Sequence, residues 1–357
     1  IRDDSLSFKL KEMILNVFAV IGRAYYEMKR FNGQEAIKYL YMLPPRHFYT
    51  SLVQRWVGTS HFNLCQYEQA IVALKEMRKI SPFQMKGVDI LSTCFWQCGL
   101  KTPLAHLAQE VTASAQTKGT PEAWCVVGNC YSLQKDHDQS LKHFKRAIQL
   151  DPSFAYAYTL CGYEFTSNED FEEAIAHFRK AISIDHRHYN AWSGLANIYL
   201  RQEKHTMAIY HFKRTIEINP YTHILYCTLS SALLKTGQIE EALEMINISV
   251  EKSPRNPQLR YTRAEVLEAM AINTKDNDKV KNDYFKQALI ELSFVHSTLP
   301  NEALVAYKLA SLCKKMNKLD YALRYFTIAH DLNPKDNNLI KNALERLDKP
   351  DVPDDSF

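Results

Sequence analysis

The chain has 357 residues, 46% of them hydrophobic, with 44 Lys and Arg against 40 Asp and Glu, a formal charge of +4. This length exceeds what one compact core usually organises, so several domains or a repeat array are expected. The small charge excess, without long basic runs, makes nucleic acid a poor candidate partner. No apolar run reaches the length of about 18 residues that a membrane span needs.

The residue pattern predicts a helical protein without catalytic or metal chemistry. Only 10 glycines and 13 prolines occur, and the apolar residues are spaced by threes and fours, as in helices. The eight cysteines lack the two-residue spacing of zinc and redox motifs, which suggests reduced thiols in an intracellular protein. The 13 histidines form no cluster with ligand spacing, and no phosphate loop or nucleophile elbow is present. We therefore expect no catalytic residue, no metal and no cofactor.

The residue pattern of the first part of the chain, residues 1–120, predicts divergent helical repeats. Small residues and a proline fit one repeat over 51–84, and Ala24, Ala36 and Leu40 fit another over 17–50. Residues 87–119 have helical periodicity but a degenerate pattern, in which Pro103 opens a second helix.

Residues 121–256 show one repeat period in several registers, and its length of about 34 residues is that of a known helix-pair repeat. A large aromatic at the fourth position of each repeat is suited to pack between helices, and a small residue at the eighth lets two helices approach closely. Proline near the end of most repeats stops the second helix, since it cannot donate the helical hydrogen bond. The pattern resembles four regular tetratricopeptide repeats. The aromatic register comprises Trp124, Tyr158, Trp192 and Tyr226.

After Ala264 the register slips, because the next small residue of its series is Ala288 where the period would place it at 276. The pattern then resumes, which predicts two further repeats over 257–336 with an insertion near 272–283. The inserted "NTKDNDKVKND" is polar, so it is either a surface loop or a helix extension. Residues 337–348 are expected to form a capping helix, and residues 349–357 an acidic tail. The predicted fold class is an all-α, right-handed superhelical solenoid of tetratricopeptide repeats.

A solenoid of this kind presents a groove lined by the first helix of each pair. Helical geometry places positions 2, 5, 9 and 12–13 of each repeat on one face, away from the packed positions. Asparagine offers both donors and acceptors to an extended peptide, and arginine can pair with a terminal carboxylate. For any single position, an ordinary solvated surface remains the alternative. The predicted groove residues are Glu122, Asn129, Tyr156, Tyr163, Asn190, Ser193, Asn197 and Arg201.

Three segments of the sequence contain residues that the repeat consensus does not dictate. They are "AWCVVGNCYSLQKDHDQSLKHFKRAIQLDPSFAYAYTL", "RHYNAWSGLANIYLRQEK" and "ALRYFTIAHDLNPK". Through them the chain resembles the C-terminal array of subunit 3 of the anaphase-promoting complex, the cell division cycle protein 27 family. The similarity covers nearly the whole chain and is weaker at 1–50 and 85–120. It implies a non-catalytic scaffold in a ubiquitin ligase of the cell cycle, located in the nucleus and cytoplasm.

The same resemblance implies the partners. Family members capture the C-terminal Ile-Arg tails of co-activator and core subunits, contact other repeat subunits, and form homodimers through an array that would lie N-terminal to this chain. Combined with the groove residues, this predicts a tail carboxylate near Asn129, Asn197 or Arg201 and its apolar side chain against Tyr156 or Tyr163.

Two alternatives keep the repeats and change the assignment. The chain could be a sister repeat subunit of the same ligase or another tetratricopeptide adaptor that binds peptides. It could also be the repeat region of a larger enzyme.

Overall fold

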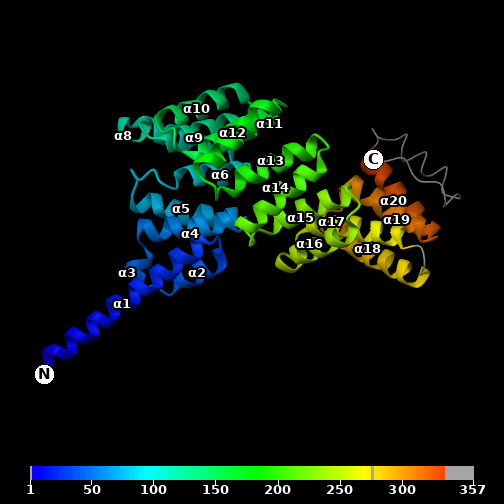
Figure 1. Cartoon of the computed structure of the whole chain (residues 1–357), viewed down its shortest axis with the longest axis horizontal. Coiled ribbons are helices and arrows are strands. Elements are labelled where there is room, and N and C mark those ends of the chain that lie inside the picture. Colours follow the sequence, from blue (N-terminus) through cyan, green and yellow to red (C-terminus); the bar gives the residue numbers. More distant parts are fainter. Residues whose placement is uncertain (1, 275–276, 334–357) are drawn as a thin grey trace. The chain divides into compact units, whose positions relative to one another are not determined.

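The computed structural model describes residues 2–274 and 277–333, with side chains from residue 11 onward (Figure 1). The predicted capping helix at 337–348 and acidic tail at 349–357 lie outside the described residues. Within them the secondary structure is helical, and the helices follow one another as antiparallel pairs, so the predicted all-α tetratricopeptide fold is confirmed.

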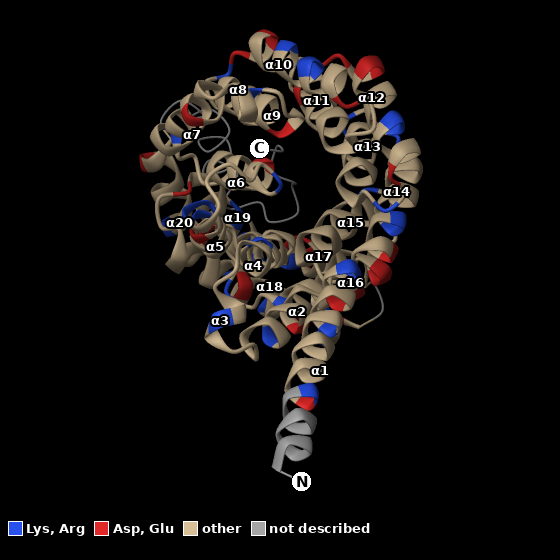
Figure 2. Cartoon of the chain, turned by 90° about the vertical axis from the view of Figure 1, so that its left-hand side faces the viewer, with Lys and Arg blue, Asp and Glu red and all other residues tan. Residues whose placement is uncertain are grey.

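The chain divides into two compact units, residues 1–222 (unit 1) and residues 223–357 (unit 2). The helices of unit 1 follow a curved path from α2 through α6 and α9 to α13 (Figure 2). They are α1 (Arg2–Lys29), α2 (Gly33–Tyr41), α3 (Pro45–Phe48), α4 (Ser51–Asn63), α5 (Tyr67–Ile80), α6 (Val88–Gln97), α7 (Lys101–Ala113), α8 (Ala115–Lys118), α9 (Pro121–Leu133), α10 (His137–Leu150), α11 (Ala155–Ser167), α12 (Phe171–Ile184), α13 (Tyr189–Arg201) and α14 (His205–Ile218).

Unit 2 continues the same helix-pair pattern. Its described helices are α15 (His223–Lys235), α16 (Ile239–Lys252), α17 (Pro257–Asn273), α18 (Asp278–Thr298), α19 (Ala303–Lys315) and α20 (Leu319–Leu332).

A phenylalanine on the second helix of a pair packs against a glycine on the first. Phe144 and Phe178 are completely buried. A β-carbon added at Gly128 would lie 2.3 Å from Cε1 of Phe144, and one added at Gly162 would lie 2.7 Å from Cε1 of Phe178. Both distances are shorter than any ordinary contact, so the ring occupies the space that a side chain would need. The small-residue register therefore sets how closely the helices approach.

The turn inside each regular pair has one residue in the left-handed region. Lys135, Glu169, Glu203 and Gly237 occupy the same repeat position, with φ of 65°, 61°, 59° and 77°. This geometry ends the first helix in the manner of an αL cap. Three of the four residues are not glycine, so the conformation is imposed by packing of the pair, at a cost of about 1 kcal/mol each.

The insertion after Ala264 is taken up mainly as longer helices. α17 and α18 have 17 and 21 residues, whereas α19 and α20 have 13 and 14. Ala271 and Phe285, on the lengthened helices, belong to the same buried cluster as Ala264. Of the two alternatives left open by the sequence, helix extension is the one observed in the described residues.

The contact between Gly128 and Phe144 predicts the effect of adding one methyl group. We expect Gly128→Ala to lower the free energy of unfolding by about 1–3 kcal/mol, because the ring has no free space into which to move. Thermal or urea unfolding measures this. The matched control is Gly22→Ala in α1, where nothing lies within 4 Å of the added carbon. This change should preserve or raise stability, since alanine favours helix. Equal behaviour of the two variants would contradict the proposed packing.

Candidate peptide-binding groove

The side chain of Asn129 is part of the helix packing. It is 4% exposed, and its amide donates to Ser92 Oγ at 2.8 Å and to Thr93 Oγ1 at 3.1 Å. These bonds join α9 to α6. The expectation that the fifth repeat position lies open in the groove is wrong for Cys125 and Thr159, because both are buried.

The two predicted tyrosines lie on α11 and also bridge helices. The hydroxyl of Tyr156 is 2.5 Å from Thr93 Oγ1 on α6. Tyr163 donates to the carbonyl oxygen of Asn190 at 3.0 Å, and its ring meets Phe178 edge to face. Both rings are thereby held in fixed positions on α11.

The remaining predicted residues are more accessible. Glu122, Asn190, Ser193 and Asn197 are half-buried. Arg201 is exposed and donates through Nη1 to the carbonyl oxygen of Thr166 at 3.3 Å. Asn190, Ser193, Asn197 and Arg201 follow one another at helical spacing on α13, so they form one stripe.

A cavity of about 350 Å³, here called the closing pocket, lies in unit 1. Of the predicted residues, Tyr156 and Asn190 line it. Its walls come from segments far apart in the sequence. Among its lining residues are Lys29, Phe31, Phe62, Asn63, Asp89, Ile90, Tyr156, Asp185, Arg187, His188, Tyr189 and Asn190.

Asp89 supplies a buried acid to the closing pocket. Its side chain is 9% exposed, and its Oδ1 accepts from the backbone N–H of Gly87 at 3.1 Å. Burial, together with the nearby charge of Glu122, raises the pKa of Asp89 to about 6. No ion pair found in the described part of the chain involves Asp89. A cation bound in the pocket would relieve this unfavourable charge.

Basic and aromatic groups also line the closing pocket. The guanidinium of Arg187 lies 5.4 Å from the centroid of the Phe31 ring and donates to the carbonyl oxygen of Lys29. The Nε2 atom of His188 is buried and has no hydrogen-bond partner among the described residues. Burial lowers the pKa of His188, so its ring stays neutral near pH 7. The pocket thus offers an acid, two cationic side chains and a neutral imidazole ring.

Sequence reasoning missed Asp89, Arg187 and His188. A signal for Asp89 was present: it is the one charged residue in the otherwise uncharged helix "VDILSTCFWQ". Arg187 and His188 lie in the turn between two regular repeats, and their approach to residues near Lys29 has no signature in the repeat pattern.

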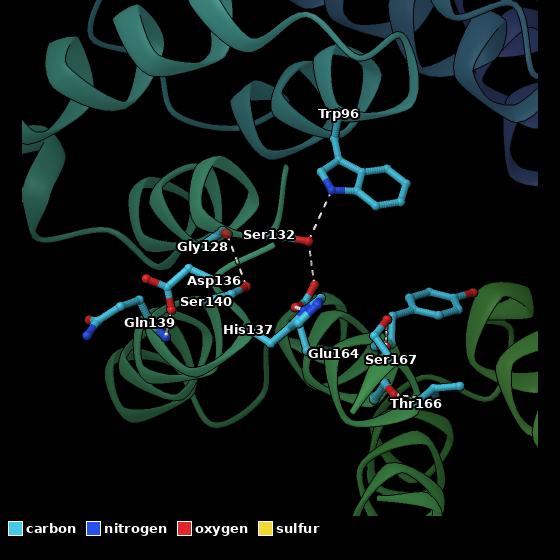
Figure 3. A network of polar contacts seen from close by, with 12 residues as sticks. Trp96, Gly128, Ser132, Asp136, His137, Gln139, Ser140, Glu164, Thr166 and Ser167 are labelled. Carbon is cyan, nitrogen blue, oxygen red and sulfur yellow. Dashed lines mark hydrogen bonds and ion pairs between the residues drawn. The ribbon is translucent and has the colours of Figure 1, made fainter. Parts of the chain in front are cut away.

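A second network of polar contacts connects neighbouring helices of unit 1 (Figure 3). Trp96 Nε1 donates to Ser132 Oγ at 3.0 Å, and that hydroxyl donates to Glu164 Oε1 at 2.5 Å. His137 Nδ1 lies 2.7 Å from Glu164 Oε2. These contacts connect α6, α9, α10 and α11, so a buried carboxylate is satisfied within the protein.

Over residues 2–274 and 277–333, no group of three or more His, Cys, Asp and Glu side chains is placed to hold a metal ion. No helix in the described part of the chain has an apolar stretch long enough to cross a bilayer.

Comparisons with known proteins agree with the tetratricopeptide fold described above. Family models for the tetratricopeptide repeat match residues 121–154, 162–203 and 189–221. Anaphase-promoting complex subunit 3 of Schizosaccharomyces pombe is 34% identical over 95% of this chain and 49% of the relative. Cell division cycle protein 27 homolog B of Arabidopsis thaliana is 36% identical over 96% of this chain and 44% of the relative. The chain thus spans about half the length of these curated relatives.

Among solved structures, the crystal structure of the APC/C hetero-tetramer Cut9–Hcn1 is similar with a TM-score of 0.70. The match covers 88% of this chain and 58% of that chain at 13% sequence identity. At this identity the likeness concerns the fold alone.

The bonds of Asn129 predict a role in stability. We expect Asn129→Ala to lower the free energy of unfolding by about 1–3 kcal/mol, because Ser92 and Thr93 lose a buried donor. Asn197→Ala is the matched control, since Asn197 is half-buried and makes no hydrogen bond to a described residue. It should change stability by less than about 0.5 kcal/mol. Urea unfolding of both variants measures the difference, and equal losses would refute the assigned role.

Proposed function

Because the chain belongs to the family of anaphase-promoting complex subunit 3, or cell division cycle protein 27, we propose that it is a non-catalytic scaffold of that complex. In this proposal, unit 1 captures the C-terminal Ile-Arg tails of co-activator and core subunits. The names of the relatives support the scaffold role and favour subunit 3 over a sister repeat subunit. The charge arrangement of the closing pocket supports the capture of the tail.

A C-terminal arginine carries a guanidinium and a carboxylate only a few bonds apart. The closing pocket is lined by the buried carboxylate of Asp89 and by the cationic side chains of Lys29 and Arg187. Charge-assisted hydrogen bonds of this kind are about twice as strong as neutral ones. In this arrangement Asp89 receives the guanidinium, and Arg187 with Lys29 attracts the terminal carboxylate. A pocket volume of about 350 Å³ lies within the range of small-ligand sites.

The isoleucine and the peptide backbone have complementary surroundings. Phe31, Phe62 and Ile90 give the pocket apolar contact area for a branched side chain. The amide of Asn190, which lines the pocket, can bond the backbone of the tail. These contacts explain how a short peptide could bind without its own secondary structure.

This arrangement revises where the tail is proposed to end. The amide of Asn129 already bonds α6, so it is a poor partner for the terminal carboxylate. We place the terminal arginine in the closing pocket and the preceding residues along Ser193, Asn197 and Arg201 of α13.

The other partners stay predictions. The relatives are named as subunits of an assembly, and the Cut9–Hcn1 structure is that of a hetero-tetramer, which supports contact with other repeat subunits. Homodimerisation through a region outside this chain and a location in the nucleus and cytoplasm complete the proposal. Co-purification of the tagged chain from dividing cells tests the first, co-purification of two differently tagged full-length copies tests the second, and fluorescence microscopy tests the third.

Peptide binding tests the tail proposal directly. We expect a fluorescent peptide that ends in Ile-Arg to bind the full chain, and Asp89→Asn to weaken it about 10- to 100-fold, as loss of one charged hydrogen bond implies. Fluorescence anisotropy measures the affinity. A peptide ending in Ile-Ala and one with an amidated C-terminus should each bind less tightly.

The controls separate the pocket from the rest of the groove. Asp138→Asn, on an exposed position of α10, should leave binding unchanged. Asn197→Ala and Arg201→Glu should reduce the affinity less than Asp89→Asn does, because they contact earlier tail residues. Equal affinity of the wild-type chain and Asp89→Asn would sink the assignment of the pocket.

The pKa of Asp89 predicts that binding depends on pH. Asp89 in the free protein is protonated below about pH 6, and only its ionised form attracts a guanidinium. The affinity should therefore fall by up to about tenfold from pH 7.5 to pH 5, as one pH unit below the pKa implies. The terminal carboxylate of the peptide stays ionised over this range, and burial moves the pKa of His188 down, away from neutral pH. Anisotropy titrations of Asp89→Asn should give a flat profile, and a fall as steep as that of the wild type would point to another group.

A further inference from the structure

Two contacts in unit 1 join segments that a solenoid keeps apart. In repeat arrays each repeat contacts only its neighbours. Here Arg187 bonds Lys29 across 158 positions of sequence, and Thr222 bonds Asn63 across 159. Both contacts lie within unit 1, where the curved path of the helices returns toward its own beginning (Figure 2).

The first contact is built on an aromatic side chain in an unusual backbone position. Phe31, in the turn between α1 and α2, has a φ of 63°, which a large residue rarely adopts. Its ring meets the ring of Tyr189 edge to face at 5.2 Å between centroids and also lies under the guanidinium of Arg187. Such pairs contribute about 0.5–1.5 kcal/mol beyond their buried area.

The second contact is a short chain of buried hydrogen bonds. Asn219 Nδ2 donates to Thr222 Oγ1 at 2.8 Å, and Thr222 Oγ1 donates to the carbonyl oxygen of Asn63 at 2.9 Å. All three residues are buried. Breaking this chain would leave the carbonyl oxygen of Asn63 without its partner unless water enters.

We infer that these two contacts form a clasp that closes unit 1, and that Thr222 positions the walls of the closing pocket without itself lining the pocket. The pocket is lined from both sides of the clasp, by Lys29 and Phe31 on one wall and by Arg187 and Tyr189 on the other. A peptide that touches both walls binds the closed form better than the open form. By linkage, the peptide then stabilises the clasp and the clasp strengthens peptide binding by the same factor.

The coupling to a peptide rests on the proposed function, whereas the clasp does not. Opening would separate the two walls, and the measured affinity would fall in proportion to the closed fraction. Thr222 is well suited to test this because it is not among the residues that line the pocket.

The first arm of the experiment uses the full chain without peptide. Hydrogen exchange followed by mass spectrometry should be faster in Thr222→Val than in the wild type on both sides of the clasp, at residues 28–33 and 185–190. Thr112→Val is the matched control, because its hydroxyl bonds the carbonyl oxygen of Ala108 within a single helix. That variant should exchange like the wild type. Thr222→Ser keeps the hydroxyl and should restore slow exchange.

The second arm adds the peptide that ends in Ile-Arg. Thr222→Val should bind it about fivefold more weakly, the effect expected for loss of one neutral hydrogen bond, while Thr112→Val binds normally. In the wild type the peptide should also slow exchange at residues 219–222, outside the pocket, which a purely structural role of Thr222 does not predict.

The outcomes separate the two proposals. Wild-type exchange and affinity in Thr222→Val would overturn the clasp. Faster exchange in Thr222→Val, together with no binding of the peptide to the wild-type chain, would overturn the proposed ligand and support the clasp.

Discussion

The close approach of paired helices, with a phenylalanine ring against a glycine, is the constraint on which the structure depends. Phe178 meets Gly162 of its own pair and Gly194 of the next, so one ring sets the spacing both within a pair and between pairs. Because the same contact recurs at equal intervals, each helix pair is rotated by a similar angle relative to the pair before it. These rotations add up and give the solenoid its curvature. In unit 1 the accumulated curvature brings Thr222 to Asn63, and the closing pocket lies beside that meeting. Packing inside the repeats therefore determines where a ligand site can form.

The buried acidic side chain in the closing pocket differs from two buried acidic side chains elsewhere in the chain in the partners that it has. Glu291 in unit 2 is buried, but its carboxylate forms ion pairs with Arg260 at 2.8 Å and Arg263 at 3.1 Å. The buried carboxylate of Glu164 accepts a hydrogen bond from Ser132 and contacts Nδ1 of His137. Asp89 has backbone hydrogen bonds without an ion pair found in the described residues, and its pKa is raised. A buried carboxylate without a cation is costly, and such groups concentrate at functional sites. That contrast is a physical reason to assign Asp89, rather than Glu164 or Glu291, to a ligand.

The repeat period was sufficient to predict the fold, because aromatic and small residues at fixed positions allow few other packings. It could not predict the pocket. Asp89 lies in residues 87–119, where the repeat pattern is degenerate and gives no register for its face. The same uncertainty misled the interpretation of Asn129, which is buried because Ser92 and Thr93 of α6 receive its amide. Tyr156 and Asn190 were found because they lie in regular repeats, whereas the opposing wall around Phe31 requires closure in three dimensions.

The repeat boundary at 185–188 shows how an array acquires a site without losing its packing. The Oδ1 atom of Asp185 accepts from the backbone N–H of Arg187 at 2.9 Å, as Asp151 does from Ser153 in the preceding repeat. The turn is thus kept although His186 replaces the proline found at position 152. Within that unchanged turn, the residue equivalent to Ser153 is Arg187, whose side chain reaches Lys29 and Phe31. Because the side chain of Asp185 maintains the turn, the side chain of Arg187 is free to serve the pocket and the clasp together.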